Sequence, residues 1–580
     1  MTGRKYWLVV ASLLLGTGLL YSVFLLPYVR TFHIKDEDFP LIFNSARQYH
    51  PNPALWVTRG YSSYFDPFPD LPHLNTHFCR PVVNATFWLE SLLSPGTGPL
   101  NLTTNFLGLV ITLILFMFFL RRETSGNILF LSSMLIVYAF SATWYEAVLL
   151  SAYRGSLLMV LFALAAFLLL PPEGSRHRGL RITLSILCQL GSLLSHEAGV
   201  VTPVIAALLF VFRRDGKVAR ARLKVLPLFL LPLLCFAALR WVFYGGVGHT
   251  YAVEPEHGWA SMGIVNGLRL LAKPFFPWET DVVVFGERSL RVVIGALMNL
   301  AGCALVAWAL LRPGKAGRRP LLRALLCLGV ALAVLWVGPK PRLMQLAAVF
   351  GALAAIVAVE QIGQGAGQRW VRRGLAAGLV GLAVGQLLIY LTSFPRMVAG
   401  GLAQNWVARV EFEGLRRVIA TMSTPTLLLV DDQGGRNGSN AMLDMAAWGN
   451  RGRVSRLITV DSLGWGSSPQ GRLRISRDNG AVRMEIVIGR DQAFAFALVD
   501  KSHLGSKFVN QGLHYEMETV PAYSPMARLL RYLGEKVEPD DVGIGRRLVV
   551  TAPPEIARDG LLIVGFDPRN MSSFSNDLTK

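Results

Sequence analysis

Residues 103–127, "TTNFLGLVITLILFMFFLRRETSGN", carry the pattern on which much of this chain is built. A helix needs about 20 apolar residues to cross the hydrocarbon core of a membrane, and here such a run ends at two arginines. Basic residues concentrate on the cytoplasmic side of membrane spans. The stretch therefore predicts a membrane-spanning helix over about 103–120 that ends in the cytoplasm.

The composition places the whole chain in the same class. The chain has 580 residues, of which 52% are hydrophobic, and its mean hydropathy is +0.43. Its net charge of +20 does not indicate nucleic-acid binding, because most arginines and lysines lie in short tracts between apolar runs. The five cysteines show no CxxC pair and no metal-ligand spacing. These features predict an α-helical polytopic membrane protein.

The alternation of apolar runs and basic tracts predicts about eleven transmembrane helices. The first run follows "MTGRK" without a small-residue cleavage site, and we interpret it as an uncleaved helix. The predicted spans are about 7–29, 103–120, 128–147, 149–170, 181–195, 198–213, 225–244, 290–311, 321–338, 343–361 and 374–393. Every heavily basic tract then falls on one side, and the two long loops, 30–102 and 245–288, fall on the other. We therefore expect a cytoplasmic N-terminus and a multi-pass protein of the inner (cytoplasmic) membrane.

The character of the sequence changes near residue 400. After the transmembrane domain, 1–395, residues 400–580 predict a soluble extracytoplasmic α/β or β-rich domain. One helix is expected at "NAMLDMAAW" (440–448). Strands are expected at "TPTLLLVDD" (424–432), "RLRIS" (472–476), "VRMEIVIG" (482–489), "QAFAFALV" (492–499), "RRLVVTA" (546–552) and "LLIVGF" (561–566).

Three acids follow the first predicted span. Asp36, Glu37 and Asp38 lie in "IKDEDFP", at the extracytoplasmic exit of that helix. Such a cluster suits a general base that deprotonates a hydroxyl, or a set of metal ligands. A solvated acidic cluster at the membrane surface is the alternative for this stretch taken alone.

Several cations share that side. Arg80 precedes a proline and an apolar run in "HFCRPVVNATFWLE" (77–90), in a loop that we expect to fall back onto the membrane surface. Lys340 and Arg342 form a basic cluster in "GPKPRL" (338–343), an exception to the charge trend that indicates an anionic ligand such as a phosphate. For Arg80 alone, an ordinary surface arginine is the competing interpretation.

Ionisable residues also lie within the apolar runs, where charge is costly and usually functional. His196 and Glu197 lie at the predicted hinge "LLSHEAGVVTP" (193–203), where His196 could bind a phosphate or transfer a proton and Glu197 could orient it. The alternative is a structural pair that ties two short helices together. Arg154 and Glu146 lie in "YEAVLLSAYRGSLL" (145–158), and Glu146 is one option for the partner of Arg154.

The order of these motifs resembles the GT-C superfamily of polytopic glycosyltransferases. The likeness is to bacterial relatives of the transmembrane O-mannosyltransferases that carry tetratricopeptide repeats. "EDFPLIFN" (37–44) resembles their acidic motif, "CRPVVNATFWLES" (79–91) their Arg-Pro motif, "YRGSLL" (153–158) their G-R-A-D-L-L segment and "LSHEAG" (194–199) their C-K-E-x-G motif. Here His196 stands in place of the lysine, the aspartate of G-R-A-D is absent, and the repeats are absent.

The resemblance implies a sugar transferred from a polyprenyl-phosphate donor, with inversion, to an extracytoplasmic acceptor that is a protein, a lipid or a glycan. In this interpretation Asp38 is the base, with Asp36 in reserve, and Glu197 orients His196 or the sugar. The cations that neutralise the leaving phosphate are Arg80, Arg154, His196 and Arg342, with Lys340 beside them. No metal or other cofactor is expected, although a divalent metal is an alternative for the acidic loop.

Two other classes compete with a transferase. A lipid or glycan transporter or flippase typically shows matching halves and broken helices near the midplane, and the sequence shows no such halves. A non-catalytic membrane assembly protein would leave the ionisable residues of the apolar runs unexplained.

Overall fold

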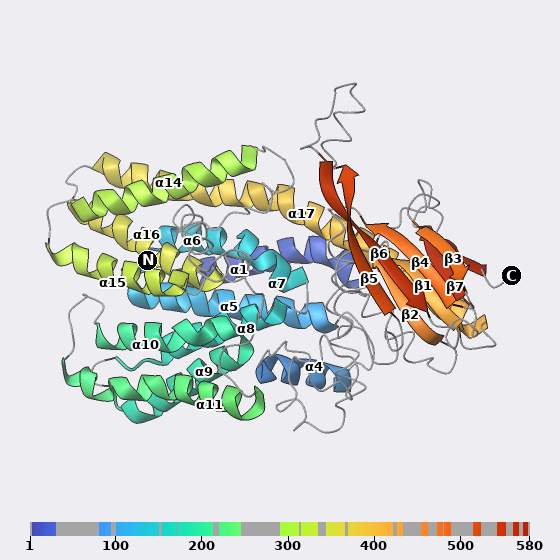
Figure 1. Ribbon diagram of the computed structural model, residues 1–580. Coiled ribbons are helices and arrows are strands. Elements are labelled where there is room, and N and C mark those ends of the chain that lie inside the picture. Colours follow the sequence, from blue (N-terminus) through green and yellow to red (C-terminus); the bar gives the residue numbers. More distant parts are fainter. Residues whose placement is uncertain are drawn as a thin grey trace. The chain divides into compact units, whose positions relative to one another are not determined.

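The computed structural model describes residues 3–30, 80–93, 100–149, 153–172, 175–212, 220–244, 290–311, 315–333, 344–365, 369–421 and eight strands between 426 and 577 (Figure 1). Five helices in these ranges are long and apolar enough to cross a membrane, over Leu8–Leu25, Thr103–Glu123, Arg222–Val242, Gln345–Gly363 and Arg373–Pro395. Shorter apolar helices accompany them. The chain is therefore a multi-pass helical membrane protein.

A described helix overlaps each of the predicted ranges. They are α1 (Gly3–Arg30), α5 (Leu100–Glu123), α6 (Ile128–Ala139), α8 (Arg154–Leu169), α9 (Arg178–Ser195), α10 (Val201–Val211), α11 (Leu231–Tyr244), α14 (Leu290–Leu311), α15 (Lys315–Ala333), α16 (Gln345–Gly365) and α17 (Arg369–Thr421), with the 3-10 helices η4 (Glu197–Val200) and η5 (Arg220–Leu230) before α10 and α11. The number that cross the membrane stays a prediction, as does the compartment that each end faces.

The predicted span over 128–147 is not one continuous helix. Helix α6 stops at Ala139, and the chain continues through a 3-10 turn, η2 (Ala142–Trp144), into the short helix α7 (Tyr145–Leu149). Side chains from distant helices bind the carbonyls that this break releases: Gln386 Nε2 donates to Phe140 O at 2.6 Å and Gln345 Nε2 donates to Thr143 O at 2.8 Å. A break at membrane depth is tolerated when protein groups satisfy the backbone in this way.

Helix α17 extends beyond the predicted span of 374–393 to Thr421. Residues 402–420 are rich in leucine, alanine, arginine and glutamate, which favour helix, and they contain no proline. Hydropathy predicts only the apolar part of a helix. The helix itself continues for as long as its residues favour helical backbone.

The segment after Arg80, expected to be a loop, is the helix α4 (Pro81–Leu93). Proline suits the first position of a helix because its fixed φ is helical and its missing N–H is not needed there. Asn84 N–H donates to Arg80 O at 3.1 Å, so the helical hydrogen bonding begins from Arg80 itself.

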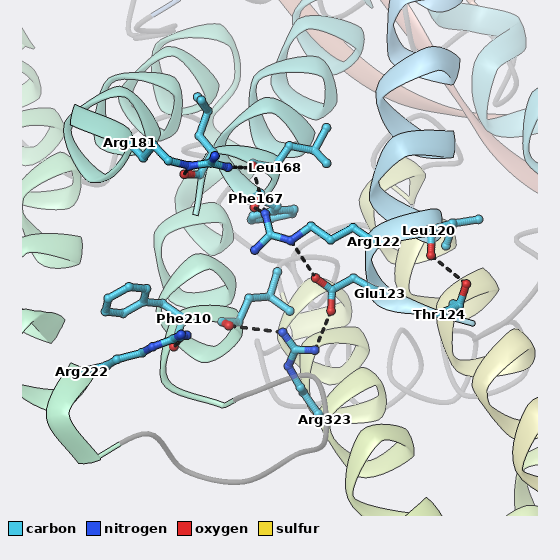
Figure 2. Close-up of polar contacts among 12 residues, drawn as sticks. Leu120, Arg122, Glu123, Thr124, Phe167, Leu168, Arg181, Phe210, Arg222 and Arg323 are labelled. Carbon is cyan, nitrogen blue, oxygen red and sulfur yellow. Dashed lines mark hydrogen bonds and ion pairs between the residues drawn. The ribbon is translucent and has the colours of Figure 1, made fainter. Parts of the chain in front are cut away.

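The basic tracts meet at one end of the helices (Figure 2). Arg122, at the end of α5, donates to the carbonyls of Phe167 and Leu168 at the end of α8, at 2.9 and 2.8 Å. Arg323 of α15 pairs with Glu123 at 2.6 Å. At the opposite ends of the same two helices, Arg154 at the start of α8 donates to Asn105 near the start of α5. The described helices therefore have one basic end and one end that carries the predicted site.

From Gly400 onward the chain forms a second compact unit. Its strands are β1 (Thr426–Asp432), β2 (Val454–Asp461), β3 (Leu473–Asp478), β4 (Ala481–Ile488), β5 (His514–Tyr523), β6 (Val542–Ala552), β7 (Leu561–Asp567) and β8 (Ser572–Asp577). One sheet has the order β2-β1-β7-β8, with β1 parallel to both β2 and β7, and the other has the order β3-β4-β6-β5 and is antiparallel.

Five of the predicted strands are confirmed, at β1, β3, β4, β6 and β7. Strands β2, β5 and β8 were not predicted, because polar or charged residues interrupt them ("VSRLITVD", "HYEMETVPAY" and "SSFSND"). The helix expected at 440–448 and the strand expected at 492–499 lie outside the described residues. The solubility and compartment of this unit stay predictions.

Candidate functional site

Arg80 links α4 to the segment after α9. Its Nε and Nη2 donate to the same carboxylate oxygen, Glu197 Oε2, at 3.0 and 2.8 Å. Arg80 is buried, and 117 residues separate it from Glu197. A buried charge is stable only with a partner. The Arg80–Glu197 pair therefore fixes the start of α4 against residues 196–199, which follow α9.

His196 has extended backbone (φ −160°, ψ 140°) and separates α9 from η4. Its Nδ1 accepts the Ala198 N–H at 3.1 Å, and its Nε2 lies 3.2 Å from Arg80 Nη2. A neutral imidazole has a single acceptor nitrogen. If Nδ1 is that acceptor, then Nε2 carries the hydrogen, and two donors face each other between His196 and Arg80.

Glu197 has an unused acceptor. Its Oε2 is shared between the two Arg80 donors, whereas its Oε1 is buried and accepts no hydrogen bond from the described residues. A buried carboxylate oxygen without a donor is costly. The Oε1 atom is therefore suited to a hydroxyl or amine donor from a bound molecule.

Arg154 occupies a second, adjacent ion-pair site. Its Nη1 lies 2.8 Å from Glu90 Oε1 of α4 and donates to Thr86 Oγ1 at 2.9 Å. Its Nε donates to Asn105 Oδ1 of α5 at 2.6 Å, and its guanidinium lies 4.6 Å from the centre of the Phe87 ring. The Arg154 side chain is only 1% exposed. Arg154 thus ties together α4, α5 and α8.

Gly155 is the point where the two ion pairs meet. A Cβ atom at this position would lie 2.7 Å from Ser195 O, just before His196, and 3.7 Å from Arg80 Cδ. The Ser195 oxygen belongs to the backbone and cannot rotate away, so only glycine permits this approach between α8 and the end of α9.

Substitution of Gly155 by alanine is expected to lower the free energy of unfolding by about 1–3 kcal/mol, the usual cost of overpacking. Gly179 at the start of α9 is the matched control, since its Cβ would meet no atom within 4 Å. Gly179→Ala should be neutral or slightly stabilising because alanine favours helix. Thermal unfolding of both purified variants in detergent checks this. Equal unfolding temperatures for the two variants would contradict the close approach of Gly155 to Ser195.

The structure brings three predicted residues together, Arg80, His196 and Glu197, and Arg154 directly precedes Gly155 at the start of α8. Five other predicted residues lie outside the described residues: Asp36, Glu37, Asp38, Lys340 and Arg342. Glu146 lies in α7, but its side chain is likewise not described. The carboxylate that the structure pairs with Arg154 is Glu90, and the predicted Glu146–Arg154 pair stays a prediction.

Two buried polar residues of this site, Glu90 and Asn105, were not predicted, and neither was the buried Arg240 of α11. Glu90 ends the apolar run that follows Arg80, and Asn105 begins that of α5. Arg240 is 2% exposed in α11, whose Phe236 packs against Leu193 of α9. All three stood out as polar residues in apolar sequence, a signal of function. Helix α4 had to be recognised before Glu90 could be paired.

No group of three or more histidine, cysteine, aspartate or glutamate residues in the described ranges could hold a metal ion. The acidic loop 36–38 is not among those ranges.

Known proteins show only low similarity to this chain. No protein-family model matches the chain, and no curated protein matches it. The crystal structure of ArnT from Cupriavidus metallidurans in the apo state is similar, with 14% identity and a TM-score of 0.44, over 96% of this chain and 99% of that chain. The crystal structure of ArnT from the same organism bound to undecaprenyl phosphate shows 12% identity and a TM-score of 0.43, over 95% and 98% of the two chains.

Proposed function

We propose that this protein is a membrane glycosyltransferase that moves a sugar from a polyprenyl-phosphate donor to an extracytoplasmic acceptor, which is a protein, a lipid or a glycan. The observation that carries the proposal is the hydrogen-bonded cluster of Arg80, His196 and Glu197, at the end of the helices opposite the basic tracts. Under the positive-inside rule, that end is extracytoplasmic.

A phosphate oxygen beside Arg80 Nη2 and His196 Nε2, which lie 3.2 Å apart, would be within reach of both nitrogens. When Nδ1 of His196 accepts from Ala198, the Nε2–H and the Arg80 guanidinium present two donors to the same space. An anionic oxygen would accept from both and remove the donor–donor conflict. As the bond from sugar to phosphate breaks, the charge that develops on the phosphate would be stabilised by the same two donors.

The remaining roles follow from the contacts and from the motif resemblance. Glu197 Oε1 would accept a sugar hydroxyl, because it is buried with no donor among the described residues. Arg154 would position α4, because four neighbouring groups already surround its buried guanidinium. Asp38 would deprotonate the acceptor hydroxyl, which then attacks the anomeric carbon as the donor phosphate leaves from the opposite face, with inversion.

Replacement of Asp38 by asparagine is expected to abolish sugar transfer, because an amide cannot accept the hydroxyl proton. The measurement is mass analysis of surface glycans in a deletion strain complemented with each variant. Asp70→Asn, in the same predicted outer loop, is the matched control and should restore the glycans. Full restoration by the Asp38 variant at equal protein level would remove Asp38 as the base.

A further inference from the structure

Four arginines surround the C-terminal ends of α8 and α10, at the basic end of the bundle (Figure 2). Arg122 and Arg181 donate to carbonyls of Phe167, Leu168 and Leu169. Arg222 and Arg323 donate to Phe210 O and Leu209 O, at 2.8 and 3.2 Å. We name this set the arginine cluster: Arg122, Arg181, Arg222 and Arg323.

The two helix ends explain why the arginines gather there. The last carbonyls of a helix lack partners within the helix and carry about half a negative charge. Each helix end receives two guanidiniums, which satisfy those carbonyls. The arginines come from α5, α9, η5 and α15, so the cluster joins four segments.

Among the described residues, the arginine cluster has more guanidiniums than carboxylate neighbours. The described carboxylate within it is Glu123, which is buried and pairs with Arg323 and, at 3.5 Å, with Arg122. Glu360 at the same end binds Ser125 N–H at 2.9 Å. Within the described part of the chain, four guanidiniums therefore face two carboxylates at this end of the helices.

The cluster is open to its surroundings and adjoins apolar surface. The Arg122 side chain is 32% exposed, and Arg181 and Arg222 are partly exposed. Leu180, Leu184 and Leu187 form an exposed stripe along one face of α9 that begins beside Arg181. Leu223, also exposed, follows Arg222. A negatively charged head beside an apolar chain matches this surface better than a free anion does.

We infer that the arginine cluster binds the phosphate of an anionic phospholipid from the cytoplasmic leaflet, with an acyl chain along the Leu180–Leu187 stripe. Basic pockets between membrane helices on the cytoplasmic side bind such head groups. The bound phosphate would link α5, α9 and η5. This site lies at the end of the bundle opposite Arg80, so it does not depend on the proposed transferase activity.

The test compares binding of phosphatidylglycerol and phosphatidylcholine to the full-length protein in detergent, by native mass spectrometry. Phosphatidylglycerol should bind more tightly, and the double variant Arg181→Gln/Arg222→Gln should weaken its binding about 20-fold. The control Arg121→Gln/Arg373→Gln removes the same charge from exposed positions on α5 and α17 and should change binding less than about threefold.

Because Arg181 and Arg222 also bind helix carbonyls, the glutamine variant changes those contacts as well as the charge. Arg181→Lys/Arg222→Lys keeps the charge and should recover most of the affinity for phosphatidylglycerol. Equal binding of the two lipids, or full phosphatidylglycerol binding by the double glutamine variant, would overturn the site. Inorganic phosphate at millimolar concentration should not displace the lipid. If it does, the cluster is a site for free anions and the lipid assignment is wrong.

Discussion

Arg80→Gln is expected to lower sugar transfer by about 10²- to 10³-fold, the usual cost of removing one donor to a charge that develops in a transition state. Arg80 holds Glu197 and faces His196, so its loss removes both a phosphate donor and the partner of a buried carboxylate. The measurement is the rate of transfer from a polyprenyl-phosphate sugar in membranes, normalised to the amount of protein.

A second variant separates chemistry from folding. In Arg80→Gln/Glu197→Gln the buried carboxylate is also neutral, so stability should recover while transfer remains low. Arg80→Lys keeps the charge but cannot donate from two nitrogens in a planar fork, and an intermediate rate is expected. Wild-type transfer by Arg80→Gln would show that Arg80 takes no part in the reaction.

Arg154→Gln is expected to lower the free energy of unfolding by about 3–5 kcal/mol, because it leaves the Glu90 carboxylate buried without its cation. The pair is nearly inaccessible, with side-chain exposures of 1% for Arg154 and 9% for Glu90. Denaturant unfolding in detergent, followed by intrinsic fluorescence, measures the effect.

The double variant Arg154→Gln/Glu90→Gln removes both charges and should recover much of the lost stability. Arg176→Gln, an exposed arginine before α9, should change stability by less than about 0.5 kcal/mol. If Arg154→Gln behaves like Arg176→Gln, the Glu90 pair is not what joins α4 to α8.

Hydropathy and charge predicted the helices well because both patterns are local. The run that ends at Arg121 and Arg122 predicted α5 to within three residues at each end. The break after Ala139 could not be predicted in this way, since it depends on Gln345 and Gln386, which lie more than 200 residues away. Helix α4 was missed because its apolar run is too short for a span and was interpreted as a loop.

Some residues of the candidate site could be predicted from the sequence, but their pairing could not. His196, Glu197, Arg80 and Arg154 stood out as charged residues in or beside apolar sequence. The sequence offered Glu146 as one option for the partner of Arg154, because it is close in sequence. The described partner, Glu90, is 64 residues away on a helix that was not expected. Such pairing depends on tertiary packing, as at Gly155, and a single sequence carries no direct signal for it.

The most direct test of the central claim is a cryo-EM map of the full-length protein with undecaprenyl phosphate added. The prediction is density for the phosphate within hydrogen-bond distance, about 3 Å, of both Arg80 and His196, with Asp38 beside the same space. Phosphate density at the opposite end of the helices, or Asp38 in a separate cavity from Arg80 and His196, would contradict the proposed transferase site.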